Sequence, residues 1–132
     1  TTAAAMTEFA AIDLLVFQSQ FEKALEAYGQ MLENYEKHSL SDEVLWEQAG
    51  ILMRLGNFEQ AIEKLEIILD QYSTDIMADD ANYTIGIIYQ ENLQKPEMAM
   101  EYYKEQLIKF PGSIYNVDAR KRFRQLRGDN IN

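Results

Sequence analysis

The chain repeats itself at an interval of 37 to 38 residues, and this repeat constrains its fold more than any other feature. Three alanines mark the interval, and each is followed four residues later by a large apolar residue. The matching positions are Ala24, Ala61 and Ala99, followed by Tyr28, Leu65 and Tyr103. Aromatic residues recur at the same interval at Phe9, Trp46 and Tyr83, and the next step reaches Arg120. A period of roughly 20–50 residues indicates a solenoid, in which each unit buries its apolar face against its neighbours.

Within each unit the apolar residues follow a helical period. Between residues 58 and 71 they recur at i, i+3, i+4, i+7, i+10 and i+11, which places them on one stripe of a helix. Only 6 Gly and 2 Pro occur in 132 residues, so turns are few, and the 47% of apolar residues supply a core. We therefore expect an all-α fold of seven helices, at 3–18, 20–36, 42–55, 58–71, 76–91, 96–109 and 114–127.

Turn and capping residues separate the expected helices. Gly56 supplies a left-handed residue where one helix ends. Residues 19–22 have the form of a capping box led by Ser19, and Pro96 suits the first position of a helix. Ser113 is the expected cap of the last helix. A turn one residue longer before Pro96 is our explanation of the 38-residue step.

This pattern resembles the tetratricopeptide repeat (TPR), a pair of antiparallel helices with a small residue in the first helix and an early alanine in the second. The residues that carry the resemblance are Ile12, Leu15, Phe21, Ala24 and Tyr28, then Leu45, Ala49, Leu52, Gly56, Phe58, Ala61 and Leu65, then Gly86, Tyr89, Ala99, Tyr103 and Pro111. It implies a single domain over 1–132, folded as a right-handed α-α superhelix. Three helix pairs are expected at about 3–37, 41–74 and 76–112, with a capping helix at 114–127.

The length and ending of the units look like those of bacterial cell-envelope proteins. The residues that carry this second resemblance are Phe110-Pro111-Gly112-Ser113. The two earlier units lack the proline and have Glu36 and Ser73 in its place. The periplasmic coordinator of the Tol–Pal system and the lipoprotein of the β-barrel assembly machinery have units of this style. The resemblance implies the C-terminal part of a larger TPR protein, located in the periplasm or at the outer membrane.

In that family the first helix of each pair lines a concave groove, and the resemblance therefore selects groove residues. They are Phe9, Asp13, Trp46, Met53, Tyr83, Ile87, Gln90, Arg120, Arg124 and Arg127. Aromatic anchors beside a methionine suit a peptide or helical partner, and three arginines on one helix face suit a carboxylate or phosphate. Alternatively, the aromatic residues belong to the core and the arginines form the solvated face of a capping helix. Ala49 and Gly86 are expected to be small because two helices approach closely there.

The charge and the residue types exclude several classes of function. Net charge is −10, and residues 1–108 carry 20 acids against 6 bases, which disfavours nucleic acid. Cysteine is absent, and the one histidine, His38, is expected at the surface of a turn. Asp79 and Asp80 lack the spacing of a calcium loop and suit the start of a helix. We expect no enzyme, no cofactor, no metal and, because the apolar run at 9–17 is short, no membrane span.

The function that these observations favour is a protein–protein interaction scaffold, which binds a peptide or helical segment of a partner in the groove. One alternative is a structural, self-associating segment of a longer solenoid. The first helix is rich in apolar residues, among them Ile12, Leu14 and Phe17, and a homodimer would cover them. A second alternative is a regulatory domain of a larger enzyme, since a fold alone does not define a function.

Overall fold

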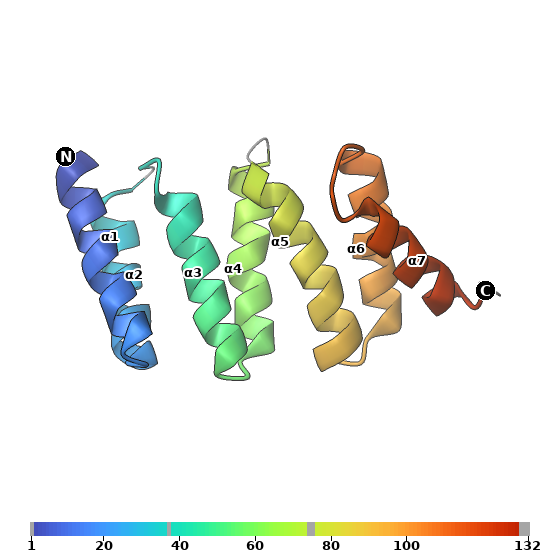
Figure 1. Cartoon of the computed structure of the whole chain (residues 1–132), viewed down its shortest axis with the longest axis horizontal. Coiled ribbons are helices and arrows are strands. Elements are labelled where there is room, and N and C mark those ends of the chain that lie inside the picture. The colour runs from blue at the N-terminus through green and yellow to red at the C-terminus, as the bar shows by residue number, and fades with distance from the viewer. Residues whose placement is uncertain (1, 37, 74–75, 130–132) are drawn as a thin grey trace. The chain divides into compact units, whose positions relative to one another are not determined.

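The computed structural model describes residues 2–36, 38–73 and 76–129, and all regular elements within these ranges are helical. They are α1 (Thr2–Phe17), α2 (Phe21–Asn34), α3 (Ser41–Arg54), α4 (Phe58–Gln71), α5 (Ile76–Ile87), η1 (Ile88–Asn92), α6 (Pro96–Lys109) and α7 (Asn116–Arg127), as Figure 1 shows. The expected all-α repeat is confirmed, and the expected helix bounds agree to within two residues. None of the helices in the described ranges has the length and apolar character needed to cross a membrane.

The chain forms two compact units, residues 1–64 (unit 1) and 65–132 (unit 2), and the division falls inside α4. The single domain expected from the sequence stays a prediction. In unit 1, α1, α2 and α3 share a core whose buried members are Ala5, Ile12, Ala24, Tyr28, Met31, Val44 and Ile51. The repeat positions Ala24 and Tyr28 are fully buried, because the helical period places them on the inner face of α2.

The turns inside the helix pairs share one geometry, in which a single residue adopts the left-handed conformation. These residues are Ser19 (φ 60°), Gly56 (φ 79°) and Gln94 (φ 55°). The left-handed turn at Gly56 is confirmed. The capping box led by Ser19 is wrong, because Gln20 directly precedes α2 and no side chain caps that helix. Pro96 is at the first position of α6, as expected.

The 38-residue step has a different origin from the one expected. Three residues separate α1 from α2, α3 from α4 and η1 from α6, so the last turn is no longer than the others. The additional residue lies inside the preceding helix, because residues 88–92 form a π-helical turn in which Leu93 N–H donates to the Ile88 carbonyl at 3.0 Å. A π turn accommodates one extra residue without breaking the helix.

Unit 2 buries Ala99, Tyr103 and Ala119 between α5, α6 and α7. Gly86 in α5 faces the Tyr103 ring of α6, and a Cβ atom added to Gly86 would lie 2.7 Å from Tyr103 Cε1. The expectation that Gly86 is small because two helices approach closely is therefore confirmed.

The last helix begins two residues later than expected, at Asn116. Tyr115 precedes it without a side-chain cap, so the expected cap at Ser113 is wrong. Ser113 instead stabilises the turn before the helix, because its Oγ accepts a hydrogen bond from Tyr115 N–H at 3.0 Å.

Candidate functional site

In unit 1, two of the expected groove residues lie on α1 beside the core. The ring of Phe9 is half-buried, and its centroid lies 5.8 Å from that of Tyr28. One turn further along α1, the exposed Asp13 accepts a 2.7 Å hydrogen bond from the Tyr28 hydroxyl. Burial and this hydrogen bond both raise the pKa of Tyr28, which keeps the phenol protonated and donating. Phe9 thus supports the core with one side and leaves the other accessible.

The other two unit 1 residues, Trp46 and Met53, lie on α3 and are half-buried. Three carboxylates of α1 and α3, those of Asp13, Glu43 and Glu47, interact electrostatically. Burial raises the pKa of the Glu47 carboxyl, and the negative charges of Asp13 and Glu43 raise it further. The ion pairs found among the described residues involve none of these three acids. We name Phe9, Asp13, Trp46, Glu47 and Met53 the α1/α3 surface.

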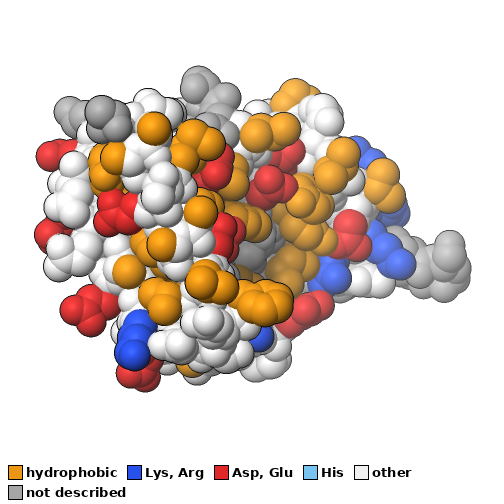
Figure 2. All heavy atoms as spheres, turned by 60° about the vertical axis from the view of Figure 1, so that its left-hand side comes forward, with side chains coloured by type: hydrophobic (Ala, Val, Ile, Leu, Met, Phe, Trp, Pro, Cys, Tyr) orange, Lys and Arg blue, Asp and Glu red, His pale blue; other side chains and the backbone are white. Residues whose placement is uncertain are grey.

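Figure 2 shows one face of the molecule with the side that carries α1 brought forward. Hydrophobic and acidic side chains are both exposed on this face, among uncharged polar ones. Apolar contact and negative charge are therefore both available on this part of the surface, and they suit a partner with apolar and basic side chains.

In unit 2, the aromatic residue of the expected groove is engaged by α7. The ring of Tyr83 stacks on Tyr115 with centroids 4.3 Å apart and an interplanar angle of 7°. Its hydroxyl donates to the Asp118 carboxylate. Burial raises the pKa of Tyr83 to about 12, and the bond to Asp118 contributes. Tyr83 therefore fastens α7 to α5.

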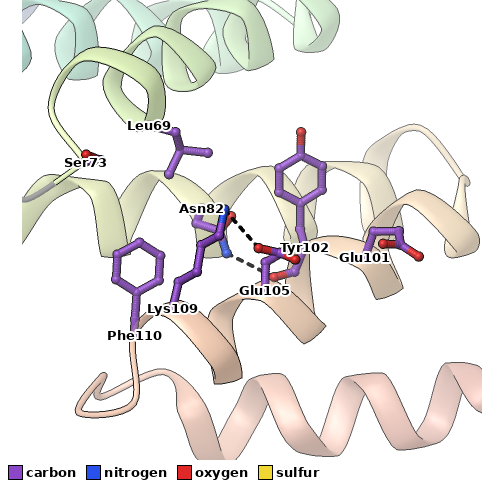
Figure 3. A pocket seen from close by; sticks show the side chains of 8 residues that line it. All are labelled: Leu69, Ser73, Asn82, Glu101, Tyr102, Glu105, Lys109 and Phe110. Carbon is purple, nitrogen blue, oxygen red and sulfur yellow. Dashed lines mark hydrogen bonds and ion pairs between the residues drawn. The ribbon is translucent and has the colours of Figure 1, made fainter.

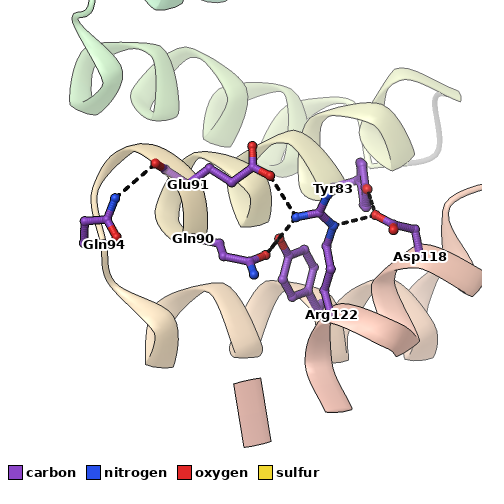
Figure 4. A network of polar contacts seen from close by, with 7 residues as sticks. Tyr83, Gln90, Glu91, Gln94, Asp118 and Arg122 are labelled. Atoms are coloured by element: carbon purple, nitrogen blue, oxygen red, sulfur yellow. Dashed lines mark hydrogen bonds and ion pairs between the residues drawn. The ribbon is translucent and has the colours of Figure 1, made fainter. Parts of the chain in front are cut away.

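Arg122 is the centre of a polar network that the sequence did not single out (Figure 4). Its guanidinium donates to Asp118 at 2.6 Å, to Glu91 at 3.0 Å and to Gln90 at 3.1 Å. Burial alone would lower the pKa of Arg122, but the hydrogen bonds to Asp118 and Glu91 raise it. The expected groove residue Gln90 also accepts a 2.6 Å hydrogen bond from Tyr103. Arg122 thus joins α7 to η1 by charge-assisted hydrogen bonds.

The remaining unit 2 residues of the expected groove fall into two groups. Ile87 is half-buried and packs against the core of unit 2. Arg120, Arg124 and Arg127 are exposed on α7, but Arg124 and Arg127 both pair with Asp129.

A signal for Arg122 existed in the sequence, since Asp118 stands four residues before it on the same helix.

The acidic pair at the start of α5 has a structural role. Asp79 accepts a 2.7 Å hydrogen bond from Ser113 and another from the buried Gln106. Asp80 accepts a 2.6 Å bond from the Tyr115 hydroxyl. Over the part of the chain that the structure describes, no group of three or more histidine, cysteine or acidic side chains could hold a metal ion.

Unit 2 also carries a surface hollow of about 450 Å³ between α4, α5 and α6. Its lining residues are Leu69, Ser73, Asn82, Glu101, Tyr102, Glu105, Lys109 and Phe110 (Figure 3). None of the expected groove residues lines it. The periodicity marked the helices correctly, but it carried no signal for a hollow formed by three of them.

Comparison with known proteins finds a family model that matches part of the chain and solved structures with a similar fold. Residues 43–75 match the sequence model of the tetratricopeptide repeat. The chain is similar to a solved structure titled "MamA RS-1 ArsTM double mutant", with a TM-score of 0.64 and 15% sequence identity. The similarity covers 93% of this chain and 73% of that one. No curated protein matches. The likeness therefore concerns the fold.

Proposed function

Starting from a TPR-like helical repeat, we propose that this chain is a protein-interaction scaffold that binds a peptide or helical segment of a partner protein. The α1/α3 surface is the observation that carries the proposal. There, half-buried Phe9, Trp46 and Met53 stand beside carboxylates that have no cationic partner among the described residues. Folds of this type are typically non-catalytic, and we infer no enzymatic role.

The proposed binding surface is restricted to unit 1. In unit 2 the ring of Tyr83 stacks on Tyr115 and its hydroxyl donates to Asp118 of α7. Ile87 and Gln90 are in contact with their own unit. Of the three arginines of the expected groove, Arg124 and Arg127 both pair with Asp129, whereas Arg120 has no ion-pair partner in the described ranges. If all three arginines were to bind one anionic group, Arg124 and Arg127 would have to leave Asp129.

The chemistry of the α1/α3 surface defines the partner. Aromatic side chains that are rigid and partly exposed act as anchors for apolar residues. Asp13 and Glu47 are close enough for Asp13 to raise the pKa of Glu47, so a lysine or arginine placed between them would relieve their repulsion. A segment with apolar residues flanking a basic residue satisfies both requirements.

The test is selection from a random peptide library, followed by titration of the selected peptides. Trp46 is the chain's single tryptophan, so its fluorescence reports directly on this surface. We expect Phe9→Ala to weaken binding about 30-fold, the effect of losing a hot spot of roughly 2 kcal/mol. Trp46→Ala, measured by calorimetry, is expected to do the same.

Ile114→Ala is the matched control, because Ile114 is 87% exposed and lies in unit 2. Helical circular dichroism of every variant must equal that of the unmodified chain. Selected peptides that bind Trp46→Ala and Phe9→Ala as tightly as the unmodified chain would refute the proposed surface.

A second candidate function is self-association through α1. Met6, Leu14 and Phe17 on this helix are 58%, 55% and 87% exposed, and a homodimer would remove this apolar area from water. Sedimentation equilibrium tests this candidate. Leu14→Glu should shift a dimer to monomer, whereas a monomer at all concentrations of the unmodified chain would refute self-association.

A further inference from the structure

The hollow between α4, α5 and α6 is lined by both apolar and polar residues. Leu69 and Phe110 supply apolar surface, and the half-buried Tyr102 also lines the hollow. The volume of about 450 Å³ lies within the range of ligand-binding clefts, roughly 300–1,000 Å³. A side chain of a partner, rather than a whole helix, fits a space of this size.

Hydrogen bonds within unit 2 already use the side-chain donors of Asn82 and Tyr102. Asn82 Nδ2 donates to the Tyr102 carbonyl at 3.0 Å and to Gln106 Oε1 at 2.7 Å. The Tyr102 hydroxyl donates to Glu66 at 2.8 Å. Figure 3 shows the Asn82 side chain pointing toward the backbone of Tyr102, with a dashed line for this hydrogen bond. These two residues therefore offer a ligand no free side-chain donor, whereas Glu101 and Glu105 offer carboxylate acceptors.

Acidic residues outnumber basic ones in the lining of the hollow. Glu101 and Glu105 line it, and Glu66 accepts a hydrogen bond from the lining residue Tyr102. Lys109 is the one basic residue of the lining, and its ammonium pairs with Glu105 at 3.0 Å. The lining is therefore net negative, and a ligand that brings hydrogen-bond donors with positive charge is complementary to it.

We propose that this hollow binds an arginine side chain, together with an adjacent apolar side chain, from an extended segment of a partner protein. The guanidinium supplies five donors for the carboxylates of Glu101 and Glu105, which line the hollow. The apolar neighbour covers Leu69 and Phe110. This second contact goes beyond the proposed function, because it lies in unit 2 and uses no residue of the α1/α3 surface.

The test is a titration of ¹⁵N-labelled chain with acetyl-Arg-Leu-amide, monitored by NMR. We expect saturable shifts of the Asn82 side-chain amide and of the backbone amides of Tyr102 and Phe110. Acetyl-Glu-Leu-amide is the probe of opposite charge and should produce no saturable shift. Equal shifts with both probes, or saturable shifts located only outside the lining residues, would overturn the proposal.

Two pairs of variants distinguish the effect of the carboxylates that line the hollow from the effect of the net charge of the chain. Glu101→Gln combined with Glu105→Gln should weaken binding roughly 2- to 30-fold, the range that two solvent-facing ion pairs supply. Glu59→Gln combined with Glu63→Gln changes the net charge equally at exposed positions outside the hollow, and should change the affinity less than about twofold. Equal weakening by both pairs would contradict the assignment.

Trp46→Ala distinguishes this proposal from the preceding one. The affinity for acetyl-Arg-Leu-amide should be unchanged in this variant, because Trp46 lies in unit 1 and does not line the hollow. Loss of binding in Trp46→Ala would place the dipeptide on the α1/α3 surface and overturn the assignment to the hollow.

Discussion

Gly86→Ala tests the close approach of α5 and α6, and the structure fixes the sign of each contribution. The added Cβ atom would lie 2.7, 3.0 and 3.4 Å from three atoms of the Tyr103 ring. Ordinary carbon–carbon contacts are about 3.5–4.0 Å, so the ring or the helix must move by roughly 0.8 Å. Tyr103 is fully buried and its hydroxyl is held by Gln90, which leaves little room for that movement.

The magnitude follows from two opposing effects. Overpacking a filled core costs about 1–3 kcal/mol. Replacing glycine by alanine inside a helix returns about 1 kcal/mol through helix propensity. We therefore expect Gly86→Ala to lower the free energy of unfolding by roughly 1 kcal/mol, with limits of about 0 and 2 kcal/mol.

Gly50→Ala isolates the packing contribution. Gly50 lies inside α3, and a Cβ atom there would meet no atom within 4 Å. This variant should gain about 0.5–1 kcal/mol, because only the propensity changes. Urea unfolding followed by circular dichroism measures both variants, and their difference gives the packing cost. If Gly86→Ala is stabilised as much as Gly50→Ala, the Tyr103 ring does not require the glycine and the argument is wrong.

Two further predictions concern charged residues. Arg122→Ala should lower stability by roughly 1–2 kcal/mol in urea unfolding, because a half-buried guanidinium loses Asp118, Glu91 and Gln90. The exposed Arg120→Ala should stay within about 0.5 kcal/mol, and equal losses in both variants would contradict the role of Arg122. Glu47 has a pKa above its ordinary value, so its charged form destabilises the fold, and this cost appears as the pH rises through that pKa. Glu47→Gln should therefore be more stable than the unmodified chain at pH 7 and equal to it below about pH 4, and a constant difference across this range would refute the shift.

The helices could be predicted from the sequence because their signals are local. The period of apolar residues, the left-handed Gly56 and the proline at the start of α6 each depend on a few neighbouring residues. The same reasoning failed for Ser19, because a capping-box pattern also fits a turn in which that residue itself is left-handed. It also placed the additional residue of the third pair in a turn rather than in the π turn at 88–92, since both give the same spacing.

The candidate site was harder to predict, because half-burial depends on what packs nearby. Spacing alone gave Trp46 and Tyr83 the same role. The structure separates them, since Tyr115 and Asp118 occupy Tyr83 in unit 2, while Trp46 stays half-buried beside Glu47 in unit 1. The hollow lined by Asn82 and Tyr102 had no pattern in the sequence, because its walls come from three helices.

The sequence by itself determined the helical repeat, its phase and the small residue at Gly86. Periodic burial and backbone conformation depend on residues that are close together along the chain. Tertiary structure alone decided which polar side chains meet. Arg122 bonds to Glu91, 31 residues away, and Ser113 bonds to Asp79, 34 residues away. Such pairs form only after packing brings their helices together, and packing therefore decides which charged and aromatic groups are left for a partner.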